Sequence, residues 1–190
     1  MHVRGYAGWA ATWAAVCWSA AALAHHSISM VEIGKPVWVT GTVVEYVVRH
    51  PHVMFTLEVK GADGRPQKMQ VEGPNLARLA RIGADEHFMK AGDVLSVCGF
   101  HLKEPYYKAD FIHGQVLVMP GGKMRLWGPY GRLENCIRPG DSHEKWVTFL
   151  KEDPAALPSW CDSRVYVKVP SVAPAGFVAA VNQLMGNPCK

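Results

Sequence analysis

The fold is decided by residues 37–72, which read VWVTGTVVEYVVRHPHVMFTLEVKGADGRPQKMQVE. Residues 37–48 alternate branched and aromatic side chains, and a second alternating run follows a His-Pro-His turn at 53–59. Both patterns are typical of strands with one buried face. Ala62-Asp63-Gly64 is a turn signal, and residues 67–72 resume the alternation. This segment therefore predicts a three-stranded antiparallel meander.

A short helix and further strands are predicted after the meander. Asn75 is placed to cap a helix that ends at Gly83, and strands are expected at 93–100, 110–119 and 124–127. The order β-β-β-α-β-β is that of a small Greek-key barrel of the OB type. A β-sandwich is the alternative, but it would need more strands than residues 25–127 offer. We expect a mainly β protein built on an OB-like barrel.

The chain changes character after Trp127. Several prolines interrupt residues 128–190, and two helical stretches are expected there, one capped by Ser142 and one beginning at Pro174. Short helices are marginal on their own. We therefore expect a helical C-terminal extension that disulfides pin to itself or to the barrel.

Residues 1–24 have the order of a bacterial signal peptide. Arg4 is followed by an apolar stretch that ends in Ala22-Leu23-Ala24, with small residues at both peptidase positions. The alternative is an uncleaved anchor, because the apolar run approaches the roughly 20 residues of a spanning helix. We expect cleavage between Ala24 and His25, export to the periplasm or beyond, and no stable membrane span afterwards.

Cleavage would discard Cys17 and leave an even number of cysteines, Cys98, Cys136, Cys161 and Cys189. Disulfides persist in an oxidising compartment, so two are expected. Four cysteines allow three pairings, and the sequence leaves the choice open. The formal net charge of +4 falls by one with the loss of Arg4, and the remaining charge is spread evenly. Such a chain is not expected to bind nucleic acid.

The new N-terminus would carry an α-amino group and an imidazole on the same residue, His25. These two nitrogens can chelate one metal ion, and neither holds its proton strongly at neutral pH. A third nitrogen from another histidine would give an all-nitrogen site of the kind Cu(II) favours, a histidine brace. The alternative is a frayed terminus in which His25 and His26 have no function.

Two histidines flank Pro51 at the connection between the first two strands. An extended backbone would point His50 and His52 to the same side, and either could complete the metal site. The alternative is a turn in which both rings cap backbone groups. His101 and His113 are reserve ligands, and each is otherwise a structural residue with hydrogen bonds of its own.

These motifs resemble a known family. The start His25-His26-Ser27, the Pro51-His52 turn, Glu72-Gly73-Pro74 and Gly92-Asp93 follow each other as in domain of unknown function family 6152, over about residues 25–123. That family comprises small secreted bacterial domains with a His-His-Ser mature start and an Asn-Pro-His motif. The resemblance implies that His25, His26 and His52 act together. His50 departs from it, because the family usually has Asn there.

The leading hypothesis is a periplasmic metal-binding protein, for copper, with His25, His26, His52 and His50 as candidate ligands and no catalytic residues assigned. The second is a non-enzymatic adaptor or ligand-binding barrel with structural histidines, in which aromatic residues such as Tyr106, Tyr107 and Trp127 or the helical extension contact an envelope protein. The third is a copper-dependent oxidase, which the lack of a recognisable substrate platform disfavours. Partner, oligomeric state and the role of the extension stay open.

Overall fold

The computed structural model describes residues 28–128, 132–166 and 170–189. Six strands form one sheet in the order β3-β2-β1-β4-β5-β6. The strands are β1 (Val31–Val47), β2 (Met54–Lys60), β3 (Pro66–Glu72), β4 (Val94–Leu102), β5 (Phe111–Val118) and β6 (Met124–Leu126). The predicted signal peptide lies outside the described residues.

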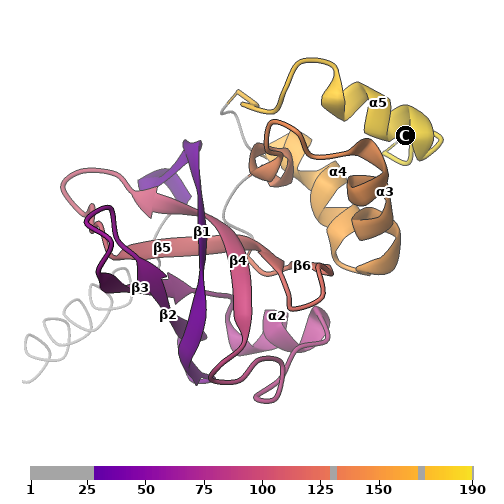
Figure 1. The fold of residues 1–190 in the computed structure, drawn as a ribbon. Coiled ribbons are helices and arrows are strands. Elements are labelled where there is room, and N and C mark those ends of the chain that lie inside the picture. Colours follow the sequence, from indigo (N-terminus) through magenta and orange to yellow (C-terminus); the bar gives the residue numbers. More distant parts are fainter. Residues whose placement is uncertain (1–27, 129–131, 167–169, 190) are drawn as a thin grey trace, which may run out of the picture.

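The sheet closes on itself because β3 also pairs with β5. This extra pairing is parallel and joins Gln70, Val71 and Glu72 to residues 111–113. Strands β1 to β5 thus form a closed barrel, with α2 (Leu76–Arg81) inserted between β3 and β4 as in an OB fold (Figure 1). The predicted mainly β, OB-like barrel with a helical, disulfide-pinned extension is confirmed.

The alternating pattern of the sequence produces the barrel core. Val53, Phe55 and Leu57 are fully buried on one face of the β2 segment, and Val71 joins them from β3. Trp127, directly after β6, fills the same interior and is also fully buried. It packs against Phe55, Phe88 and Tyr46 rings and is therefore not part of an exposed ligand surface.

Strand β1 begins earlier than predicted. The alternation is obscured by Gly34-Lys35-Pro36, and the pairing with β4 also shifts there, between Val31 and Pro36. Proline has no N–H to donate to a sheet, so an irregularity at this point has a direct cause. The extra residues matter for the site, because they place the start of the described chain beside the end of β4.

Helix α2 is capped as predicted. The Asn75 side chain accepts a hydrogen bond from the backbone N–H of Arg78 at 2.9 Å, which satisfies one of the free donors of the first turn. Gly83, with a φ of 66°, follows the last turn. The helix lies at one end of the barrel (Figure 1).

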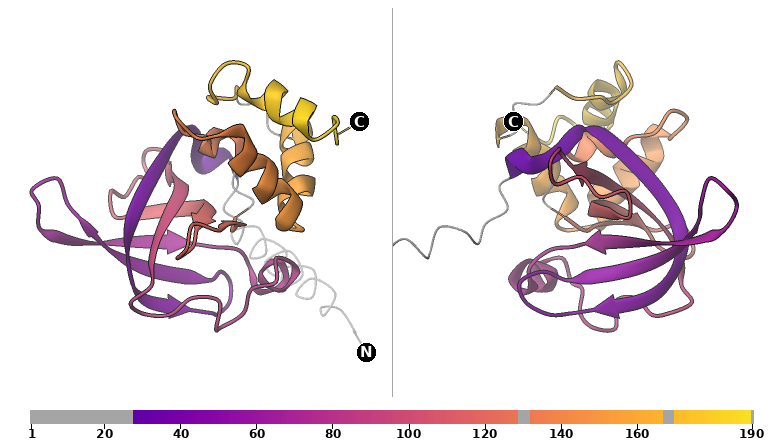
Figure 2. Two further views of the ribbon diagram at one scale, coloured as in Figure 1. Left: turned by 45° about the vertical axis from the view of Figure 1, so that its right-hand side comes forward. Right: turned by 90° about the vertical axis from the view of Figure 1, so that its left-hand side faces the viewer.

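The extension contains one more helix than predicted. Helices α3 (His143–Glu152), α4 (Ala156–Tyr166) and α5 (Phe177–Leu184) gather on one side of the barrel (Figure 2), after a 3-10 turn, η3 (Leu133–Cys136). The Ser142 cap is confirmed by a hydrogen bond from the backbone N–H of Lys145. Helix α4 was not predicted, because its sequence lacks amphipathic periodicity and contains Pro158.

No helix in the described ranges is long and apolar enough to cross a membrane.

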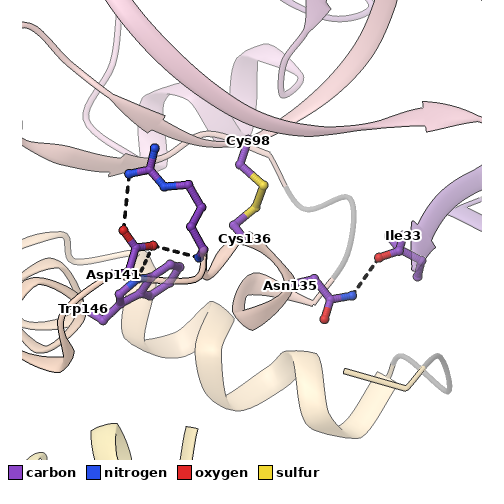
Figure 3. The surroundings of a disulfide bond; sticks show 7 residues. Ile33, Cys98, Asn135, Cys136, Asp141 and Trp146 are labelled. Carbon is purple, nitrogen blue, oxygen red and sulfur yellow. Dashed lines mark hydrogen bonds and ion pairs between the residues drawn. A yellow bond between two sulfur atoms is a disulfide. The ribbon is translucent and has the colours of Figure 1, made fainter. Parts of the chain in front are cut away.

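A second hydrophobic core lies between the extension and the outer face of the barrel. Phe100 and Leu126 from the barrel join Trp146, Phe149 and Trp160 from the helices, and all five are buried. Both predicted disulfides form, Cys98–Cys136 between β4 and η3 and Cys161–Cys189 within the extension. The first is drawn in Figure 3.

Buried polar side chains fix the extension in place. The Asn135 amide donates to the carbonyl of Ile33 at 2.7 Å (Figure 3), and the Asp153 carboxylate accepts from the backbone N–H of Leu126 at 2.9 Å and from Arg125 at 3.2 Å. A buried acceptor without such a donor would be costly, so these contacts select one docking geometry.

Asp141 stabilises the start of α3. Burial alone raises the pKa of Asp141, but hydrogen bonds from the backbone of Arg138 and the indole of Trp146, with the charges of Arg138 and Lys145, outweigh it. The net effect holds the pKa of this carboxyl below its usual value. The contacts are visible in Figure 3.

Candidate functional site

His52 is held against Glu72 by the pairing of β2 with β3. Met54 pairs with Glu72, the backbone N–H of Val53 donates to the carbonyl of Pro74 at 2.9 Å, and that of Gly73 donates to Val53 at 2.7 Å. These bonds bring the His52 ring onto the carboxylate, with Nδ1 in contact with Oε1. The His52 side chain is one-third exposed, whereas that of Glu72 is 10% exposed.

The same carboxylate faces a second imidazole from β5. The parallel pairing places Glu72 opposite His113, and His113 Nδ1 lies 3.4 Å from Oε2. His113 is buried, and its ring packs edge to face on Phe111, with centroids 5.2 Å apart. One carboxylate thus lies between two imidazoles, which we call the His52–Glu72–His113 cluster.

This arrangement determines which nitrogen of His52 can bind a metal. A carboxylate only accepts, so a neutral His52 ring in this contact would carry its hydrogen on Nδ1 and keep its lone pair on Nε2. A carboxylate or carbonyl on the remote nitrogen is the usual support of a metal-binding histidine. The contact with Glu72 therefore leaves Nε2 as the nitrogen of His52 that could bind a metal.

The cluster borders a cavity of about 250 Å³. Its lining consists of Glu72, Leu102, Lys108, Phe111 and His113. Leu102 and Phe111 form apolar walls of the cavity, and the carboxylate of Glu72 and the imidazole of His113 are buried beside them. Lys108 is exposed and contributes a positive charge. The cavity thus combines a polar interior with apolar walls at the seam between β3 and β5.

The described chain begins next to this cavity. Val31 pairs with Leu102, and Lys103 donates its backbone N–H to the carbonyl of Met30 and its ammonium to that of Ser29, both at 2.8 Å. Leu102 is also a wall of the cavity. The 3-10 turn η2 (Ile28–Met30) is therefore fastened beside the seam that holds Glu72 and His113.

Two glycines allow the seam to sit directly on the barrel core. A Cβ atom at Gly73 would lie 2.5 Å from the Trp127 ring, and one at Gly114 would lie 2.8 Å from it. These glycines directly follow Glu72 and His113 in sequence. The fully buried indole of Trp127 therefore supports the backbone that carries the cluster.

The reserve histidine His101 has a structural role. Its Nδ1 lies 2.9 Å from the carbonyl of Phe111 and 3.2 Å from that of Lys108. Carbonyls only accept, so Nδ1 is the donor. His101, whose ring also contacts Tyr107, thus fastens the loop between β4 and β5.

The structure brings together some of the predicted ligands. His52 lies in the cluster, whereas His50 is exposed, precedes a cis peptide bond to Pro51, and makes no side-chain hydrogen bond or ion pair within the described residues. His25 and His26 lie outside the described residues. Within residues 28–128, 132–166 and 170–189, no group of three or more His, Cys, Asp or Glu side chains is arranged to hold a metal.

Sequence reasoning named His113 only as a reserve ligand and did not predict that it meets Glu72. Glu72 stands in a Glu-Gly-Pro segment that is typical of a turn, and His113 lies in a strand. Their meeting depends on the parallel register of β3 and β5, which strand patterns do not reveal. The OB topology itself predicts the pairing of β3 with β5. The predicted fold class was therefore the signal from which the contact of Glu72 with His113 could have been inferred.

Comparisons with known proteins give one family and several distant folds. Two crystal forms of Rim1, a mitochondrial single-stranded DNA binding protein from S. cerevisiae, match with 8% and 7% identity and TM-scores of 0.34 and 0.36. Each match covers 45% of this chain and 93% or 92% of the Rim1 chain, and it carries no conclusion about what this chain binds. No curated protein sequence matches. The model of the Family of unknown function (DUF6152) matches residues 14–108, half of the length, so the chain belongs to this family.

Proposed function

We propose that the protein binds copper in the bacterial periplasm through its mature N-terminus. The α-amine and imidazole of His25 supply two nitrogens, and Nε2 of His52 supplies the third. The single observation that carries this proposal is the contact of His52 Nδ1 with Glu72. This contact supports coordination through Nε2, because a carboxylate on the remote nitrogen is the usual support of a metal-binding histidine.

The reach of the terminus supports the proposal. Ile28 is the first described residue and lies three positions after His25. Three residues span at most about 10 Å when extended. Residues 29–31 are fastened to Leu102 and Lys103 beside the cavity, so a segment of three extended residues is long enough to reach from there to the seam that carries Glu72.

The donor set favours copper over other ions. Three nitrogen donors in a T-shaped arrangement suit Cu(II), which leads the affinity order of the divalent first-row metals. The Glu72 carboxylate would lie behind His52 and offset part of the ion's charge. His26 or His50 would be a further ligand, because both are close in sequence to the two that we assign.

Two features support the proposed compartment. Residues 1–24 have the order of a cleavable export signal, and both disulfides fit an oxidising environment. Export also creates the ligand, because the α-amine exists only after cleavage. A peptide nitrogen at the same position would not be basic.

The test is a competition titration of Cu(II) against a chromophoric chelator. The mature chain starting at His25 is compared with the same chain acetylated on its α-amine, with His52→Ala and with Glu72→Gln. We expect large losses of affinity for the first two and a 10- to 100-fold loss for Glu72→Gln, the usual effect of removing an outer support. His87→Ala is the matched control, since the His87 side chain is 84% exposed and its ion-pair partner is Glu86 rather than Glu72.

Unchanged affinity in the acetylated chain would overturn the brace. Unchanged affinity in His52→Ala would remove His52 from the site. If the mature chain binds no copper at all, the protein is instead the adaptor or ligand-binding barrel with structural histidines.

A further inference from the structure

Met54 is half-buried at the start of β2 and, within the described residues, belongs to neither hydrophobic core. Other methionines of the described ranges are part of a core or pack against one, namely Met69, Met89, Met119, Met124 and Met185. Met30, in η2, is also outside the cores, but it precedes the sheet. Methionine usually fills gaps in a core, so core packing does not account for a methionine at position 54.

The strand geometry turns Met54 to the outer face of the barrel. Phe55 is buried in the barrel core, and side chains alternate along a strand, so Met54 points outward. Val53 is also fully buried, and its backbone N–H continues the pairing by donating to the carbonyl of Pro74 at 2.9 Å. Residues two apart in an extended chain share a face, so His52 and Met54 lie on the same outer side.

Glu72 connects these two side chains. It pairs with Met54 across β2 and β3, and its carboxylate contacts Nδ1 of His52. Residues directly opposite each other in an antiparallel pair have Cβ atoms about 4.5–5.5 Å apart on the same face. The imidazole of His52 and the thioether of Met54 therefore both neighbour the Glu72 side chain, and Nε2 is the nitrogen of His52 that this contact leaves for a metal.

We infer that His52 and Met54 form a binding site for Cu(I), through Nε2 of the imidazole and the sulfur of the thioether. Thioether sulfur is a soft donor that selects Cu(I), and imidazole nitrogen suits copper as well. This inference rests on the proposed function for the role of His52 as a copper ligand, but its site consists of described residues alone. It adds that the protein binds the reduced ion as well as Cu(II).

The two oxidation states use different partners of His52. Cu(II) favours nitrogen donors, which the proposed terminal site supplies, whereas Cu(I) binds the sulfur of Met54. The methionine side chain is unbranched and has three rotatable bonds, so its sulfur can turn toward the His52 ring while the sheet stays unchanged. Removing the sulfur should therefore weaken the binding of Cu(I) and leave the binding of Cu(II) as it is.

The experiment is a competition titration of Cu(I) against a chromophoric chelator in the absence of oxygen. The mature chain is compared with Met54→Leu, and each is also titrated with Cu(II). Leucine replaces methionine at nearly the same volume and lacks the sulfur, so the barrel is retained. We expect Met54→Leu to weaken Cu(I) binding by at least about tenfold, because losing a ligand should cost no less than losing an outer support of one. The affinity for Cu(II) should not change.

Two further variants frame this result. Met69→Leu is the matched control, because Met69 lies on the neighbouring strand β3 and packs against the barrel core. Its affinity for Cu(I) should equal that of the unaltered chain. His52→Ala should weaken the binding of both ions, because His52 is shared.

X-ray absorption at the copper edge gives a second readout. The Cu(I)-loaded chain should show a sulfur neighbour of copper that is absent from Met54→Leu. A Cu(I) affinity of Met54→Leu equal to that of Met69→Leu, or a spectrum of the unaltered chain without sulfur, would overturn the inference.

Acetylating the α-amine of the mature chain separates this inference from the proposed function. If Cu(I) binding depends on Met54 while Cu(II) binding is the same with and without acetylation, the Cu(I) site stands and the proposed terminal site fails. If acetylation abolishes Cu(II) binding while Met54→Leu leaves Cu(I) binding unchanged, the terminal site stands and the inference fails.

Discussion

Replacing Asp153 by Ala should loosen the extension from the barrel. The Asp153 carboxylate is fully buried and accepts from the backbone N–H of Leu126 at 2.9 Å, from Arg125 Nε at 3.2 Å and from the backbone N–H of Ala155 at 3.0 Å. Alanine would leave the buried N–H of Leu126 without its acceptor, which costs about 1–3 kcal/mol.

The ion pair with Arg125 adds a smaller amount. Removing one partner of a buried pair costs about 3–5 kcal/mol, but Arg125 is 20% exposed, donates to the carbonyl of Ile82, and lies over the Phe88 ring. The charge of Arg125 would therefore not be left buried without a partner when Asp153 is removed. We expect a total loss of about 3 kcal/mol in the free energy of unfolding.

Urea denaturation followed by tryptophan fluorescence measures this loss, provided that the slope m is unchanged. Asp162→Ala is the matched control, because Asp162 is an exposed carboxylate in the same extension. Its effect should stay within about 0.5 kcal/mol. If Asp153→Ala is no more destabilising than this control, the buried carboxylate does not anchor the extension.

Three other perturbations test the same packing. Replacing Cys98 and Cys136 together by Ala removes a cross-link between positions 38 residues apart. This should lower the free energy of unfolding, measured in urea, by about 4 kcal/mol. A loss below about 1 kcal/mol would show that this disulfide does not stabilise the fold. Gly73→Ala should lower the free energy of unfolding, measured by calorimetry, by about 1–3 kcal/mol, because its new methyl group would lie 2.5 Å from the Trp127 ring. An unchanged melting temperature would show that the backbone at this position can move to make room for the methyl group. Because the folded pKa of Asp141 is lowered, its contribution is complete above the unfolded pKa of about 3.9 and disappears as the pH falls through the folded value. Asp141→Asn should therefore destabilise more at pH 6 than at pH 2, and an equal effect at both would contradict the ion-pair account.

The barrel could be predicted from the sequence because its strands follow the simplest rule. Residues 53–59 and 67–72 alternate with period two, and Asn75 and Gly83 delimit the intervening helix. Each of these signals depends only on residues that are close together in the chain. Two disulfides followed in the same way from an even count of cysteines.

The parts that could not be predicted depend on distant residues. Helix α4 has no amphipathic stripe, because buried Ala156 and Trp160 are its contribution to a core built mostly by other elements. Likewise, Glu72 and His113 meet only through the parallel pairing of β3 with β5. Local patterns carry no information about such a register.

Pulsed electron–nuclear double resonance on the Cu(II)-loaded mature chain tests the central claim most directly, with the α-amine of His25 labelled with ¹⁵N. The account predicts a strong coupling to a directly bound ¹⁵N nucleus, and its absence when the α-amine is acetylated. A spectrum that is identical with ¹⁴N and ¹⁵N at this position would show that the terminal amine is not a ligand, and would contradict the account.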